Sequence, residues 1–330
     1  MVKSSSEIIK PIGGYFEIAE EGIGEYPHKN GIQLNTGRNA LEYILRSISH
    51  IDCIYLPYYT CEVVLEPIRK LNISYKFYHI NDHIEIADDI VLNDDEYIIV
   101  NNYFGIKDEY IRKVASIYGK KLIVDCAQSF FQPVLEGVKM FYSTRKFVGV
   151  PDGGVAYCCK NDYLKSYSKD DSSDRTKHLY IRKEFGPEAG FETYKENEKK
   201  LDYQDIYIMS DFTNIILHKI DYSSIITNRR RNYEYLHANL KGSNKFSFSN
   251  ISSFACPMVY PYYTDDNTLK AKFIKNKIFV ATYWSNVLEW CKPKDIEYKL
   301  ANNIIAIPID QRYGIEDMDR IIKIINSISK

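Results

Sequence analysis

Apolar strand patterns and amphipathic helix patterns alternate through the first half of the 330-residue chain. Short apolar runs bounded by turn residues predict buried strands, and apolar residues every three or four positions predict helices. The predicted elements, in chain order, are a helix over 39–50 with Thr36 as its N-cap, a strand over 53–56, a helix over 62–71, strands over 74–80 and 96–103, a helix over 107–118, and strands over 121–126, 138–143 and 154–159. This alternation predicts an α/β fold with a mostly parallel sheet and helices on both faces.

The pattern changes after residue 160. Residues 160–204 are highly charged and carry almost no strand signal, which indicates a solvated helical excursion. The remaining elements are a long helical pattern over 206–240, a strand over 256–260, a helix over 267–275, strands over 279–283 and 304–309, and a helix over 315–328. We therefore predict a large domain over residues 1–220 and a small C-terminal α+β domain over residues 221–330.

Composition excludes several classes of protein. Lysine and arginine number 43 and aspartate and glutamate 44, so no basic field is available for nucleic acid. The apolar runs are too short to span a membrane, and the first ten residues lack the apolar core of a signal peptide, which favours a cytoplasmic protein. The 7 cysteines form no C-x-x-C pair and are interpreted as reduced thiols. His79 and His83 lie in a strand-and-turn context, so no metal site is predicted.

Two places where strands and helices meet carry charges. The segment Thr36-Gly37-Arg38 begins a helix, whose free N–H groups and dipole suit a phosphate; an ordinary N-cap is the alternative. Asp125 ends a core strand, where a carboxylate is costly unless it has a cationic partner, and a structural ion pair is the alternative.

Two further places could complete such a site. Lys146 follows a strand and precedes the glycine turn over 150–154; if buried, its amine could take part in imine chemistry, whereas the alternative is a surface lysine. Tyr103 and Phe104 follow another strand and could stack on a flat ring or belong to the core. A phosphate cradle, an aromatic residue, an acid and a lysine, in this order, are the parts that a pyridoxal-phosphate (PLP) enzyme needs.

The sequence resembles the DegT/StrS family of PLP-dependent sugar aminotransferases, which have the fold type I architecture. The resemblance rests on an ordered set of segments that spans most of the chain. They are Leu56–Cys61 (LPYYTC), 102–105 (NYFG), 124–128 (VDCAQ), Lys146 followed by Asp152-Gly153-Gly154, 209–211 (MSD) with Arg229 and Tyr233, 307–309 (IPI) and 316–318 (EDM).

The resemblance implies a role for each matching residue. Lys146 would bind the cofactor covalently and move the proton during transamination, and Asp125 would pair with the pyridinium nitrogen. Gln128 would contact the hydroxyl side of the ring. The phosphate would be held by three residues at the helix start, Thr36, Gly37 and Arg38.

The chain departs from the family pattern at two anchoring positions. The family's phosphate-binding serine is replaced by Phe141, which leaves Ser143 or Arg145 as the substitute. The position of the ring-stacking aromatic residue is Cys61, so that Tyr103 or Phe104 would take over the stacking.

The resemblance further implies a homodimer that transfers an amino group from glutamate or glutamine to a nucleotide-linked keto-sugar. A dehydratase of the family has histidine in place of the lysine, and Lys146 argues against that activity. Another PLP-dependent reaction on the same fold, or a non-catalytic PLP-binding regulatory or scaffold protein, stays open as an alternative.

Overall fold

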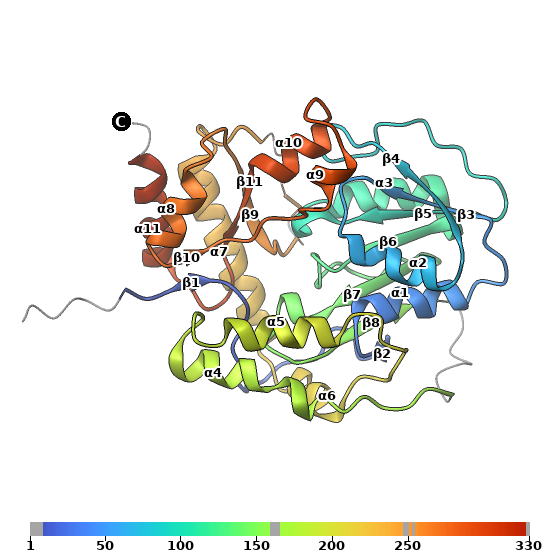
Figure 1. The fold of residues 1–330 in the computed structure, drawn as a ribbon, viewed down its shortest axis with the longest axis horizontal. Helices are drawn as coiled ribbons and strands as arrows, with labels where there is room; N and C mark the ends of the chain where they lie inside the picture. The colour runs from blue at the N-terminus through green and yellow to red at the C-terminus, as the bar shows by residue number, and fades with distance from the viewer. Residues whose placement is uncertain (1–8, 159–165, 247–250, 253–254, 328–330) are drawn as a thin grey trace, which may run out of the picture.

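A seven-stranded sheet forms the centre of the computed structural model, which describes residues 9–158, 166–246, 251–252 and 255–327 (Figure 1). Its strand order is β2-β8-β7-β6-β5-β3-β4. The strands are β2 (Ile32–Leu34), β3 (Cys53–Pro57), β4 (Ser74–Tyr78), β5 (Glu96–Asn101), β6 (Leu122–Cys126), β7 (Lys139–Ser143) and β8 (Gly154–Tyr157). The five strands from β4 to β7 are parallel, and β8 runs antiparallel to both β7 and β2. The predicted mostly parallel sheet is therefore confirmed.

Helices cover both faces of this sheet, as the alternation predicted. Side chains of a strand point alternately to opposite faces, and β6 shows the consequence. Ile123 joins a core cluster with residues of α1 (Gly37–Arg46) and α2 (Leu65–Lys70), whereas Leu122 and Val124 join a second cluster with residues of α3 (Asp108–Tyr118). Every residue of β6 is buried, which explains why its sequence is apolar apart from Asp125.

The charged excursion contains two helices, α4 (Lys177–Phe185) and α5 (Phe191–Lys200), which pack against each other along one side of the molecule (Figure 1). They are helical, as predicted, but they also cover part of the chain near the N-terminus. The ring of Tyr15 stacks on that of Tyr194 at a centroid distance of 4.7 Å. The strand predicted over 154–159 ends at Tyr157, and its last position lies outside the described residues.

The long helical pattern over 206–240 is not one helix, which corrects the prediction. It forms α6 (Asp211–Leu217) and α7 (Tyr222–Leu240). The hydroxyl of Ser210 accepts from the Thr213 N–H, and the carboxylate of Asp221 accepts from the Ser224 N–H. Each helix therefore has its own N-cap. The apolar spacing continues from α6 into α7 because each helix buries one of its faces.

The C-terminal part contains a second small sheet and further helices. In it β9 (Val259–Tyr263) pairs antiparallel with β11 (Ile304–Pro308), so β9 lies three residues beyond its predicted start. The helices are α8 (Leu269–Lys275), α9 (Val287–Trp290), α10 (Ile296–Asn303) and α11 (Ile315–Asn326), of which α9 and α10 were not predicted.

Residues close to the N-terminus lie beside this C-terminal part. The two-residue strand β1 (Ile12–Gly13) pairs in parallel with β10 (Ile278–Phe279), which is shorter than the strand predicted over 279–283 (Figure 1). The division of the chain near residue 220 stays a prediction. Within the described residues, the model contains no helix with both the length and the apolar character needed to cross a membrane.

Candidate active site

The carboxyl ends of β3, β5, β6 and β7 lie at one edge of the sheet because these strands are parallel. Hydrogen bonds join the segments that leave this edge: the Tyr103 hydroxyl donates to the carbonyl of Tyr59 (2.8 Å), and the Phe104 N–H donates to Oε1 of Gln128 (2.8 Å). Ligands of open α/β sheets bind at such an edge. Most of the predicted site residues are attached to it, namely Cys61, Tyr103, Asp125, Gln128, Ser143 and Lys146.

Lys146 ends a short 3-10 turn, Thr144–Lys146, that follows β7 directly. The turn is held by the glycine turn behind it, because the Thr144 N–H donates to the Gly153 carbonyl (3.2 Å). The side chain is half-buried, and in the part of the chain that the structure describes no hydrogen bond or ion pair holds its ammonium group. Its charge acts on the nearby carboxylate of Asp125.

Asp125 lies on the neighbouring strand and faces the same region. Its carboxylate accepts from the Ala127 N–H (2.7 Å). Burial raises the pKa of Asp125 above its ordinary value, although the positive charge of Lys146 and the Ala127 hydrogen bond oppose the increase. A buried carboxylate of this kind is stabilised strongly by an additional cationic partner, such as a protonated ring nitrogen.

The start of α1 offers a place for an anion. The Thr36 hydroxyl caps the helix and accepts from the Asn39 N–H (3.0 Å), while the N–H groups of the first turn at Gly37 and Arg38 have no intrahelical acceptor. A Cβ atom placed on Gly37 would lie 3.6 Å from Cβ of Ser143, so this turn and the end of β7 are neighbours.

The side chain of Arg38 is engaged elsewhere. Its guanidinium pairs with Glu66 (3.0 Å) and with Asp202 (2.6 Å). Of the predicted phosphate-binding set, the structure thus brings Thr36, Gly37 and Ser143 together, whereas Arg38 contributes its backbone position.

Two buried polar atoms on the segments that leave this edge have no partners. Oε1 of Gln128 accepts from the Phe104 N–H, but its Nε2 is buried and has no partner among the described residues, and the buried hydroxyl of Tyr59 has none there either. Such atoms are rare in folded proteins unless a ligand or water satisfies them. Together with the lysine and the carboxylate, they fit a polar heteroaromatic cofactor such as PLP.

Tyr103, a predicted stacking residue, and Cys61, another predicted cofactor-binding residue, lie in different surroundings. Tyr103 is fully buried, and its ring packs between those of Tyr59 (5.4 Å) and Trp284 (6.0 Å). Cys61 is half-buried at the start of a 3-10 turn, Glu62–Val64. The structure places both near the edge of the sheet, and whether either contacts the cofactor stays a prediction.

This fold is similar to that of several solved aminotransferases. DesV of S. venezuelae, solved with a ketimine intermediate, is 12% identical; the match covers 91% of this chain and 85% of that one with a TM-score of 0.66. A Streptococcus pneumoniae protein described as a candidate sugar aminotransferase is 14% identical over 96% of this chain and 94% of its own, with a TM-score of 0.65. A DegT/DnrJ/EryC1/StrS aminotransferase from Brucella abortus is 15% identical over 90% and 85% of the two chains, with a TM-score of 0.60.

The chain has the fold of the PLP-dependent sugar aminotransferases. This confirms the predicted fold class. In sequence the likeness is faint: no model of a protein family matches the chain, and no curated protein matches it.

On this aminotransferase fold, a cavity of about 130 Å³ lies beside Lys146. Several of the residues that line it were not predicted from the sequence. Tyr15 and Phe16 come from the segment near the N-terminus, and Tyr194 and Glu198 come from α5. No local pattern indicates these residues, because they reach the site through contacts between distant parts of the chain. The abundance of tyrosine, 29 residues, was the only sign of half-buried aromatic surfaces.

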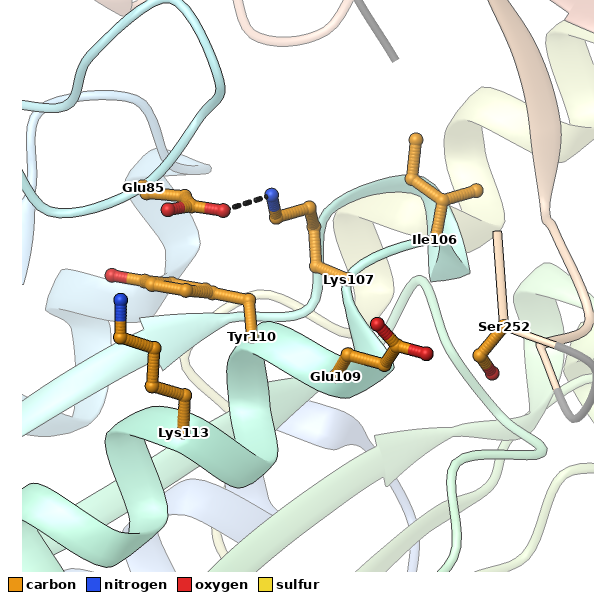
Figure 2. A pocket seen from close by; sticks show the side chains of 7 residues that line it. All are labelled: Glu85, Ile106, Lys107, Glu109, Tyr110, Lys113 and Ser252. Carbon is orange, nitrogen blue, oxygen red and sulfur yellow. Dashed lines mark hydrogen bonds and ion pairs between the residues drawn. The ribbon is translucent and has the colours of Figure 1, made fainter. Parts of the chain in front are cut away.

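A second pocket, of about 370 Å³, lies at the start of α3 (Figure 2). One of the residues that line it is a buried lysine, Lys107. Its Nζ lies 2.5 Å from the carboxylate of Glu85 and 3.1 Å from the carbonyl of His83. The Lys107 ammonium is thus held by a carboxylate and a carbonyl, whereas no described residue holds that of Lys146.

Proposed function

We propose that the protein is a PLP-dependent aminotransferase of the DegT/StrS type. One observation carries the proposal. Lys146, which no other described residue holds, and the buried acid Asp125 lie near each other at the carboxyl ends of adjacent parallel strands. This is the arrangement that the chemistry of PLP requires.

When bound, PLP supplies an aldehyde that forms imines with amines and a ring that accepts electrons from the substrate carbon. Lys146 would hold the cofactor covalently through Nζ and would move a proton at the reacting carbon of the substrate. Asp125 would hold a proton on the nitrogen of the ring, and the unpartnered Nε2 of Gln128 would donate to the hydroxyl side of the ring.

Anchoring of the phosphate is assigned to the start of α1. The N–H groups of Gly37 and Arg38 and the hydroxyl of Ser143 would donate to it, and the positive end of the helix dipole would add to the attraction. Tyr15, Phe16 and Tyr194, which line the cavity beside Lys146, would exclude water there.

We infer the substrates from the family resemblance and from what is bound in one solved structure with this fold. DesI was solved in the presence of its TDP-sugar product. We infer that the amino acceptor of this protein is a nucleotide-linked keto-sugar and that the donor is glutamate or glutamine. We also infer a homodimer, because the resemblance implies this assembly.

Absorption spectra of the purified protein with PLP test this proposal. We expect a visible band from cofactor bound to lysine, its loss in Lys146→Ala, and its conversion by glutamate in the wild type. A band that neither an amino donor nor a TDP-keto-sugar changes would favour the alternative, a non-catalytic PLP-binding protein.

A further inference from the structure

Arg145, the residue before Lys146, lies in the wall of the same cavity as Lys146 and Ser143. Its side chain is 17% exposed, and its Nε is buried without a partner among the described residues. A guanidinium has five N–H donors in a fixed plane, which suits the oxygens of a phosphate. The position therefore offers a cation and unused donors close to the start of α1.

Two further arginines lie close enough to act on this position. Burial lowers the pKa of the Arg145 guanidinium; Tyr194 and Asp152 oppose this decrease, whereas Arg38 and Arg175 add to it. Each of these two neighbours has its own acidic partners, since Arg38 pairs with Glu66 and Asp202 and Arg175 pairs with Asp170 (2.7 Å). Arg145 itself forms an ion pair with Glu198 of α5 among the described residues.

Glu198 reaches Arg145 from a part of the chain that is distant in sequence. Its side chain is 35% exposed, so the carboxylate stands between the cavity and the solvent. The residue before it, Asn197, is buried, and both polar atoms of its amide lack partners among the described residues. Unsatisfied buried groups weaken the packing of α5 and lower the cost of moving it.

We propose that Arg145 is an anion-binding residue for the phosphate of the cofactor and that the Glu198 carboxylate holds this position until the phosphate displaces it. The inference rests on the proposed function and names the side chain that compensates for the hydroxyl donor lost where Phe141 replaces the usual serine. A phosphate monoester carries more charge and more acceptor oxygens than a carboxylate, so it competes for the guanidinium effectively. Its binding releases Glu198 and thereby couples cofactor binding to the position of α5.

Titrations with PLP and with pyridoxal, which lacks the phosphate, test the proposal in four variants. Glu198→Gln removes the competing charge, so we expect PLP to bind about fivefold more tightly, as expected from the loss of one partly exposed ion pair. Arg145→Gln should weaken PLP binding about tenfold or more, and Arg145→Lys less. The matched control is Glu196→Gln, an exposed position on the same helix, which should leave the affinity unchanged.

Pyridoxal separates the phosphate effect from imine formation at Lys146. Its affinity should be the same in the wild type and in Glu198→Gln. If Glu198→Gln binds PLP as the wild type does or more weakly, or if pyridoxal and PLP respond alike, Glu198 does not compete with the phosphate and the inference is wrong. Wild-type protein that binds neither compound would instead contradict the proposed function, and the inference with it.

Hydrogen exchange gives a readout that is independent of affinity. In the wild type, the amides of residues 191–200 should exchange faster after PLP is added, because Glu198 loses its partner. In Glu198→Gln they should exchange fast already and change little. Exchange over α5 that does not respond to PLP in the wild type would overturn the proposed coupling.

Discussion

Asp125 shows how burial and nearby charges oppose each other at a single residue. Burial alone would favour its neutral form, and the opposing effect of Lys146 and of one backbone N–H limits the increase in its pKa. The energetic cost of the charged form is what makes a cationic ring nitrogen a favourable partner.

Asp125→Asn should bind PLP and turn over slowly. The amide keeps the size of the side chain but cannot hold a proton on the ring nitrogen, and loss of an electrostatic interaction of this kind typically lowers the rate by about 10²-fold or more. A single-turnover measurement with glutamate gives this rate, and thermal unfolding shows whether the variant is folded. Near-normal turnover would mean that Asp125 is only structural.

His28 should make the stability depend on pH. It is buried, with Nε2 2.6 Å from the Phe130 carbonyl, and burial lowers its pKa to about 4. The unfolded chain, with a histidine pKa of about 6.5, binds one proton more between pH 6.5 and 4, so the free energy of unfolding decreases as the pH falls through this window. From pH 7.5 to pH 5 the loss should be about 2 kcal/mol.

Urea unfolding of His28→Gln checks this expectation. The variant should lose about 2 kcal/mol less than the wild type between pH 7.5 and pH 5, even if it is less stable at both. The control is His83→Gln, an exposed position, which should follow the wild type. Equal pH dependence in all three proteins would show that His28 is not a buried neutral histidine.

Among the elements, the glycine turn over 150–154 packs against the start of α1. This contact sets the distance between Lys146 and the candidate anion site at the start of α1. A Cβ on Gly154 would lie only 2.1 Å from the carbonyl oxygen of Thr36, so the two backbones touch at this point. The same turn accepts the Thr144 N–H that fixes the Lys146 turn.

Gly154→Ala should therefore move the turn that carries Lys146 away from the start of α1. The clash is with backbone, which cannot rotate away, so we expect a destabilisation of about 1–3 kcal/mol and weaker PLP binding. Gly242→Ala is the matched control, because a Cβ there meets nothing within 4 Å. Equal stability and equal affinity in the two variants would contradict the described contact.

The sequence predicted elements well where local pattern determines them. β6 is buried along its whole length, and its apolar run gave its bounds to within one residue. The break between α6 and α7 was missed because no glycine or proline marks it and the apolar spacing continues beyond Asp221. The shift of β9 has the same origin, since pairing with β11 rather than local pattern decides which residues are in the strand.

At the scale of the whole molecule, the lysine side of the candidate site depends on long-range contacts. Glu17 pairs with Arg182 of α4 (2.7 Å) and with Arg312 near the C-terminus (2.8 Å), which fixes the segment that carries Tyr15 and Phe16. Residues at strand ends were predictable because a parallel sheet gathers them at one edge. The walls from the N-terminal segment and α5 were not, because no local pattern encodes which distant surfaces meet.

A homodimer is expected from the resemblance and agrees with the exposed aromatic residues of α4 and α5. Tyr180, Phe185 and Phe191 are 49%, 75% and 48% exposed. Exposed large apolar side chains that gather on one part of a surface often mark an interface. Phe185→Ser should shift the sedimentation of the protein towards the monomer, whereas the control Ile23→Ser, at a position that is 96% exposed, should not. A wild-type protein that sediments as a fully active monomer would rule out the dimer.

Borohydride reduction of the PLP-loaded protein, followed by peptide mapping, shows which lysine holds the cofactor. Reduction makes the bond between the cofactor and its lysine permanent. We predict a single modified peptide that contains Lys146 and no modification in Lys146→Arg. Modification of a different lysine, such as the ion-paired Lys107, or no modification of the wild type, would contradict it.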